Sequence, residues 1–151
     1  MTYAPRQGEY FRIGRLDTYA TVDILLRQTA DRPIAARHVH ACYFRNSVLA
    51  LRTPDGFSVE YLLGVLNSNT AAKLFQMLVA ESGQRAFPQV KVRALRRLPI
   101  PDPGQSPDTV AEIERLVRQI EAGGPLTDDT ASLTELNQVV AGLYGVDAKD
   151  T

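Results

Sequence analysis

The sequence lacks several features that mark large classes of protein. A single cysteine, Cys42, among 151 residues excludes an internal disulfide framework and suits the reducing cytoplasm, where we expect the protein to be. The apolar runs span only three or four residues, as in Ile24–Leu26 and Val48–Leu51, whereas a membrane-spanning helix needs about 18. The N-terminus lacks the apolar segment of a signal peptide, so we expect no membrane partner.

Catalytic signatures are equally scarce. The sequence has no glycine-rich phosphate loop of the Walker or dinucleotide-binding type. It has no Pro-Pro dipeptide, so the Asn/Asp-Pro-Pro-aromatic signature of amino-methyltransferases is absent. Its two histidines lie two residues apart and offer no catalytic triad, and its one Asp-x-Lys sequence, Asp147–Lys149, stands next to the C-terminus. We therefore expect no catalytic residues in this chain.

One group of metal-ligating residue types allows two interpretations. His38, His40 and Cys42 alternate, so a strand would place all three on one face, where their side chains could bind zinc. A closed tetrahedral site needs a fourth ligand, and none stands nearby in the sequence. We expect no metal, and a small zinc-binding domain is kept as an alternative.

The net charge of zero results from two regions of opposite sign. Residues 1–101 contain 14 Lys and Arg against 7 Asp and Glu, and residues 102–151 contain 3 against 10. The two net charges are therefore +7 and −7. A GC-rich genome would explain why arginine outnumbers lysine, but not why the positive charges gather in the first two-thirds of the chain. A basic region beside an acidic one indicates a polyanion-binding part of the protein.

The basic region reads as strands followed by a pair of helices. Strands are expected within residues 9–16, 22–28, 34–39 and 43–52, and Thr53–Gly56 is typical of a turn. Ser58 should cap one helix, and Asn67–Asn69 should end it and begin a second helix that stops at Gly83. We expect their core-facing residues to be Tyr61, Leu62, Val65 and Leu66, then Leu74, Phe75, Leu78 and Val79. A short strand or helical turn should follow, anchored by Val90, Val92, Leu95 and Leu98.

The acidic region reads as two amphipathic helices. Ser106 should cap the first, with Pro107 at its first position, and a capping box at Ser132–Glu135 should begin the second, which Gly145 closes. Their apolar stripes are Val110, Ile113, Leu116, Val117 and Ile120, then Leu133, Leu136, Val140, Leu143 and Tyr144. We predict an α+β fold with a twisted, mainly antiparallel sheet and packed helices, followed by a helical acidic C-terminal tail. Residues 1–101 would form one domain, with residues 102–151 as an extension packed on it.

The polar loops of the basic region contain the residue types that read DNA. Arginine and the amides of Gln and Asn can form bidentate contacts with guanine and adenine edges, and aromatic or lysine side chains can support them. The candidate DNA-binding residues are Arg27, Gln28, Arg32, Arg37, Arg45, Asn46, Arg85, Phe87, Gln89, Lys91 and Arg93.

Four segments, in the same order, resemble the TaqI-like C-terminal specificity domain. Residues 24–35 are similar to that family's "RQTGD…IA" segment, with Ala30 at its usual glycine, and residues 43–47 to its "YY-x-x-N-S/T" segment. Residues 61–68 resemble "YLLGLLNS", and residues 85–101 resemble "FPQVKI…LPIP". Leu143–Gly145 is similar to the "LYGL" helix that often ends such proteins.

The resemblance implies a target recognition domain, which is the DNA-reading part of adenine-specific DNA methyltransferases and of fused type II restriction–modification enzymes. It implies sequence-specific binding of double-stranded DNA, no catalysis and no cofactor in this domain. An upstream methyltransferase domain of the same polypeptide would use S-adenosylmethionine, with or without a nuclease. The alternative is a protein-interaction module of an anti-phage defence complex that does not read sequence.

Overall fold

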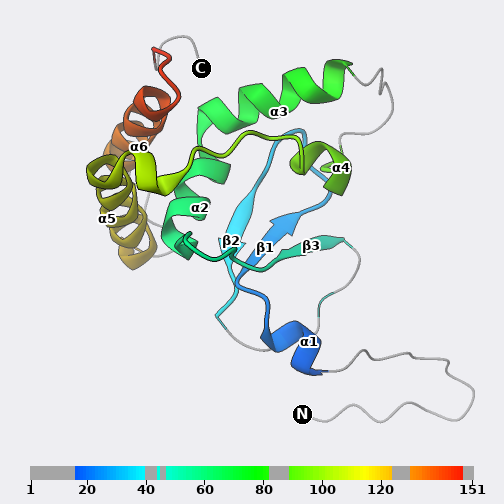
Figure 1. Ribbon diagram of the computed structural model, residues 1–151. Coiled ribbons are helices and arrows are strands. Elements are labelled where there is room, and N and C mark those ends of the chain that lie inside the picture. The colour runs from blue at the N-terminus through cyan, green and yellow to red at the C-terminus, as the bar shows by residue number, and fades with distance from the viewer. Residues whose placement is uncertain (1–15, 40–43, 45–46, 82–88, 124–129, 148–151) are drawn as a thin grey trace, which may run out of the picture.

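The computed structural model describes residues 16–39, 44, 47–81, 89–123 and 130–147, and it has the α+β fold that the sequence predicts (Figure 1). A three-stranded antiparallel sheet has the order β2-β1-β3. In chain order the elements are α1 (Leu16–Ala20), β1 (Ile24–Arg27), β2 (Ala35–Arg37), β3 (Val48–Leu51), α2 (Val59–Asn67), α3 (Asn69–Glu81), α4 (Val92–Leu95), the 3₁₀ helix η1 (Pro103–Gln105), α5 (Pro107–Gly123) and α6 (Thr130–Leu143).

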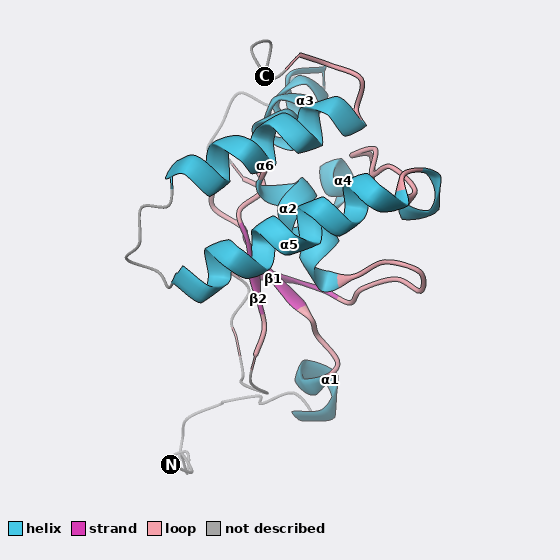
Figure 2. Ribbon diagram, turned by 90° about the vertical axis from the view of Figure 1, so that its left-hand side faces the viewer, coloured by secondary structure: helices cyan, strands magenta, loops and turns pink. Residues whose placement is uncertain are grey.

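Helix α2 lies at the centre of the molecule. Ser58 caps it as expected, because its Oγ accepts a hydrogen bond from the Tyr61 backbone N–H at 3.1 Å. The expected apolar face is buried, but so are Leu63 and Gly64, so all six residues 61–66 are buried. A helix that is apolar on all sides needs neighbours on all sides. The sheet, α3, α5 and α6 supply them, and Figure 2 shows α5 and α6 in front of α2.

One hydrophobic core joins the basic and the acidic regions of the sequence. Its buried members include Ile24 from β1, Tyr61 from α2 and Phe75 from α3. The same cluster contains Ile113, Leu116 and Val117 from α5 and Leu136 and Val140 from α6. Each fully buried side chain of this size contributes about 1.5–3 kcal/mol to the free energy of unfolding. The division at residue 101 stays a prediction, but the core itself is shared across it.

Short polar contacts close the ends of these elements. Asn67, the last residue of α2, bonds to both backbone groups of Ala35 in the edge strand β2: its Oδ1 accepts from the N–H and its Nδ2 donates to the carbonyl, each at 2.9 Å. Ser68 Oγ accepts from the Ala71 N–H and so caps α3. Gly56 and Gly145 have φ of 84° and 69°, which explains glycine at the turn after β3 and at the end of α6.

Several expectations about local structure were wrong. Helix α6 begins at Thr130, so Ser132 is not its cap; Ser132 is buried, and its Oγ accepts from Gln119 Nε2 at 2.9 Å. Leu133 and Val92 are 42% and 47% exposed and do not anchor the core. The expected strand at 43–52 is limited, among the described residues, to β3. Residues 9–15 lie outside the described residues, and Leu16 begins α1.

Candidate nucleic-acid interface

Three segments that are distant in sequence meet where β1 ends. The Arg27 N–H donates to the Ile34 carbonyl at 2.9 Å, and the Gln28 N–H donates to the Ser47 carbonyl at 3.0 Å. The Val90 N–H donates to the Gln28 carbonyl at 2.7 Å. These backbone bonds place the end of β1, the approach to β3 and the approach to α4 side by side. They bring together four of the sequence candidates, namely Arg27, Gln28, Gln89 and Lys91.

The segment around α4 carries a dense positive charge. Lys91, Arg93, Arg96 and Arg97 are all exposed, and residues 89–98 contain no acidic residue. Val90 and Leu98, which are 0% and 6% exposed, fix both ends of this segment in the core. Arg96 and Arg97 are not among the DNA-binding candidates predicted from the sequence. Four cations within seven residues without a carboxylate were the signal that could have found them.

Arg32 lies on the turn between β1 and β2 and is exposed. Ala30 and Pro33, on either side of it, are buried and hold the turn against the core. Ala30 occupies the position at which the resemblance expects glycine, and the structure accommodates its methyl group in the hydrophobic cluster. Arg32 is therefore presented to solvent by a turn that is fixed at two points.

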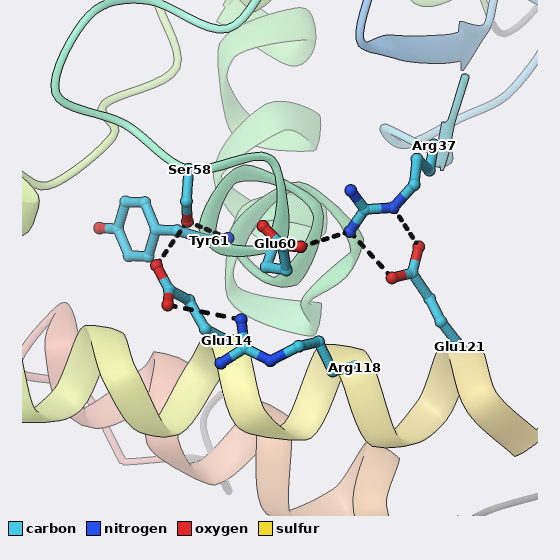
Figure 3. Close-up of polar contacts among 7 residues, drawn as sticks. All are labelled: Arg37, Ser58, Glu60, Tyr61, Glu114, Arg118 and Glu121. Carbon is cyan, nitrogen blue, oxygen red and sulfur yellow. Dashed lines mark hydrogen bonds and ion pairs between the residues drawn. The ribbon is translucent and has the colours of Figure 1, made fainter. Parts of the chain in front are cut away.

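Arg37 is engaged within the protein, in contrast to the other described candidates (Figure 3). Its Nε and Nη2 donate to the two carboxylate oxygens of Glu121 at 3.0 and 2.9 Å, and Nη2 also donates to Glu60 at 2.8 Å. The bonds to Glu121 and Glu60 hold the pKa of this guanidinium above its usual value, although partial burial opposes them. Arg37 thus joins β2 to α2 and α5, which gives it a structural role, and its contact with DNA stays a prediction.

The pKa of Glu60 responds to the same contact. Partial burial opposes ionisation, but hydrogen bonds from the backbone and from Arg37 outweigh it, so the pKa lies below the usual value of a glutamate. Its charge is therefore present at neutral pH, where it meets that of Arg37. The other partner of Arg37, Glu121, is 84 residues away in the sequence. No local sequence pattern could therefore indicate that these two side chains meet.

Other candidates lie outside the described residues. Arg45, Asn46, Arg85 and Phe87 belong to this group, as do His40 and Cys42 of the alternating triplet. His38 is described, and its Nδ1 donates to the Val22 carbonyl, 3.0 Å away. Within the described part of the chain, no three His, Cys, Asp or Glu side chains gather as metal ligands would.

The acidic helices lie on the other side of the molecule. In Figure 1, α5 and α6 stand at the left, whereas α4 and the end of β1 stand at the right. Two arginines on α5 are matched by carboxylates on that helix: Arg115 pairs with Glu112 at 2.7 Å, and Arg118 with Glu114 at 3.7 Å. Positive charge at the α4 side is therefore separated from the negative charge of α5 and α6 by the body of the domain.

The segments that carry the family resemblance meet in the fold. The Tyr61 hydroxyl donates to the Pro101 carbonyl at 2.9 Å, and the Tyr144 hydroxyl donates to the Pro99 carbonyl at 2.6 Å. Burial raises the pKa of both phenols, with smaller contributions from Asp102 for Tyr61 and from Tyr61 for Tyr144. Three segments of the resemblance, at 61–68, 85–101 and 143–145, thus hold one another.

A comparison with protein families decides the classification. The model of the TaqI-like C-terminal specificity domain matches residues 3–100. The chain belongs to this family. TaqI-like specificity domains recognise DNA in restriction–modification enzymes and are generally non-catalytic. Neither a curated protein nor a solved structure shows significant similarity to the chain. Among the helices described for this TaqI-like domain, none has the length and apolar character needed to cross a membrane.

Proposed function

We propose that this domain reads a specific sequence in double-stranded DNA as the target recognition domain of an adenine-specific methyltransferase. The observation that carries the proposal is a surface that we call the basic end. It consists of Arg27, Arg32, Lys91, Arg93, Arg96 and Arg97, all exposed. Helix α4, which carries or adjoins four of them, lies on the side away from α5 and α6. Cations that neutralise phosphates supply most of the sequence-independent affinity of a DNA-binding protein.

The side chains divide into two roles by their chemistry. Lys91, Arg93, Arg96 and Arg97 stand on or beside a short helix and suit the phosphate backbone, where their charge fixes the position of the duplex. Gln28 and Gln89 carry amides that can bond to both N6 and N7 of adenine. The backbone bond from Val90 to Gln28 holds these two segments together, and a base-reading side chain needs such a fixed support.

The parent enzyme supplies the chemistry. An upstream methyltransferase domain of the same polypeptide would bind S-adenosylmethionine and act on an adenine that leaves the base stack. This chain contributes no glycine-rich loop for that cofactor, and its residues position the DNA. The acidic helices would face away from the duplex, because their carboxylates would repel phosphate.

Competition binding tests this function directly. Methylome sequencing of cells that carry the intact parent protein gives the target, and the full chain is then titrated with matched and scrambled duplexes. Arg93→Ala should weaken binding to both and flatten the slope of log K against log salt by about 0.9. Gln89→Ala should reduce the preference for the matched duplex, by about 1–3 kcal/mol if the contact is bidentate. Arg118→Ala, on α5, is the matched control and should change neither.

Two results would count against the proposal. Equal competition by matched and scrambled duplexes would remove sequence reading and favour the interaction-module alternative. A loss of affinity in Arg118→Ala equal to that in Arg93→Ala would indicate that the duplex binds at α5 and not at the basic end.

A further inference from the structure

A polar hollow lies between the β1–β2 turn and helix α3, and Arg32 is the one residue of its lining that the sequence already pointed to as a DNA-binding candidate. Its volume is about 460 Å³, and it opens at the surface. It is lined by Asp31 and Arg32 from the turn and by Asn69, Ala72, Lys73 and Gln76 from α3. The four α3 residues are spaced by three, one and three positions, so they form one face of the helix. We call this feature the α3 hollow.

The lining offers hydrogen-bond donors to an anion. Arg32 brings a planar guanidinium and Lys73 an ammonium group, and Asn69 and Gln76 add side-chain amides. The small side chain of Ala72 leaves space between them. One carboxylate, from Asp31, stands against two cations, so the lining has a net charge of +1.

The donors on α3 have a fixed support. The Asn69 backbone N–H donates to Asn137 Oδ1 at 2.7 Å, which holds the start of α3 against α6. Ser68 Oγ accepts from the Ala71 N–H at 3.1 Å and so caps the first turn of α3. Phe75, on the other face of the helix, is 1% exposed and fixes its rotation. The polar face of α3 is therefore presented in one orientation.

We propose that the α3 hollow binds a phosphate group of the DNA backbone. The inference rests on the proposed function and adds α3 to its binding surface. Continuity supports it, because Arg32 belongs both to the basic end and to the hollow, and α3 contacts α4. Lys73 also lines an adjoining hollow, which Asp147 lines as well.

Replacement of Asp31 by asparagine distinguishes a phosphate from a base in the hollow, because the two ligands predict opposite changes in affinity. If a phosphate enters the hollow, the Asp31 carboxylate repels it, and Asp31→Asn should strengthen binding of every duplex about threefold at low salt. If the hollow instead reads a base, the Asp31 carboxylate would accept from an exocyclic amine. Asp31→Asn would then weaken binding of the matched duplex alone. Asp31 is exposed, so this near-isosteric change does not disturb the core.

The experiment titrates the full chain with one matched and one scrambled duplex at several salt concentrations. Lys73→Ala should weaken both alike and flatten the slope of log K against log salt by about 0.9. Arg118→Ala controls for loss of a charge elsewhere, and circular dichroism checks the fold of each variant. If Lys73→Ala and Asp31→Asn bind like the unmodified chain while Arg93→Ala binds less well, the hollow is not a phosphate site and the proposed function stands. If Arg93→Ala is also unaffected, the proposed function itself fails.

Discussion

Replacement of Gly64 by alanine should destabilise the protein, although alanine is the better helix former. A Cβ at position 64 would lie 2.5 Å from Ile113 Cγ2, 3.1 Å from Val117 Cγ2 and 3.4 Å from Leu136 Cδ1. The closest of these atoms is a methyl group attached directly to the branch point of a side chain that is 0% exposed, so it cannot turn away. Either α5 shifts away from α2 or neighbouring side chains leave their preferred rotamers.

The magnitude follows from two opposing contributions. Overpacking of a filled core costs about 1–3 kcal/mol, and the short contact places Gly64→Ala near the upper value. The gain in helix propensity from glycine to alanine returns about 1 kcal/mol. The net loss in the free energy of unfolding should be about 2 kcal/mol, or about 4–8 °C in the melting temperature of a chain of this size.

Gly142 provides a matched control in α6, because a Cβ there would meet nothing within 4 Å. Gly142→Ala should therefore stabilise the protein by up to about 0.5–1 kcal/mol. Urea unfolding followed by circular dichroism measures both variants. Ile113→Ala removes the obstructing methyl group, so the double variant with Gly64→Ala should lose less than the two single variants together. If Gly64→Ala is as stabilising as Gly142→Ala, α2 and α5 do not approach as closely as these distances indicate, and a Cβ at position 64 is not crowded.

Three further predictions concern the core and the polar contacts that join its elements. Phe75→Ala should lower the free energy of unfolding by about 3–5 kcal/mol, measured in urea, without reducing DNA binding by the folded fraction, because the ring is 1% exposed; unchanged stability with lost binding would make Phe75 a DNA contact. Arg37→Ala should lower the free energy of unfolding by about 1 kcal/mol at pH 7, a modest value because its ion pairs with Glu60 and Glu121 are partly exposed to solvent. Since the pKa of Glu60 is lowered, the part of this contribution that comes from Glu60 is present above about pH 4.3 and is lost as the pH falls through the folded pKa, so the difference in stability between the two chains should decrease in acid. Tyr144→Phe leaves the Pro99 carbonyl without its donor and should lower the free energy of unfolding by about 1 kcal/mol. Burial raises the pKa of Tyr144, so above about pH 10 its phenol ionises more readily in the unfolded chain than in the folded one. The stability of the unmodified chain should therefore fall above that pH, and the stability of the variant should fall less.

Local signals were read correctly from the sequence where a residue acts on its immediate neighbours. The cap at Ser58, the break at Asn67–Asn69, the turn at Gly56 and the helix end at Gly145 depend on a few adjacent positions. The capping box at Ser132–Glu135 was wrong for an informative reason. The same hydroxyl that could cap a helix accepts from Gln119 on α5, and this tertiary contact is not visible in a local pattern.

In the candidate site, too, the sequence indicated local features but not contacts between distant residues. Alternation and composition indicated polar residues at the ends of strands, and the structure places Arg27, Gln28, Gln89 and Lys91 together there. They could not show that Arg37 meets carboxylates on α2 and α5, because that depends on how the helices cover the sheet. The polar face of α3 was also missed, since its outward residues were treated only as the complement of a core-facing stripe.

The contact between Asn67 and Ala35 has a consequence for the behaviour of the protein at high concentration. An edge strand exposes unpaired N–H and carbonyl groups that can pair with a strand from another molecule. On β2 the Asn67 amide already occupies both such groups of Ala35, in the manner of a one-residue strand. Because β2 is only three residues long, this single side chain protects much of its outer edge. Asn67→Ala should thus expose an edge strand to which a strand from another molecule can pair. We expect this variant to aggregate at high concentration even if the domain still folds.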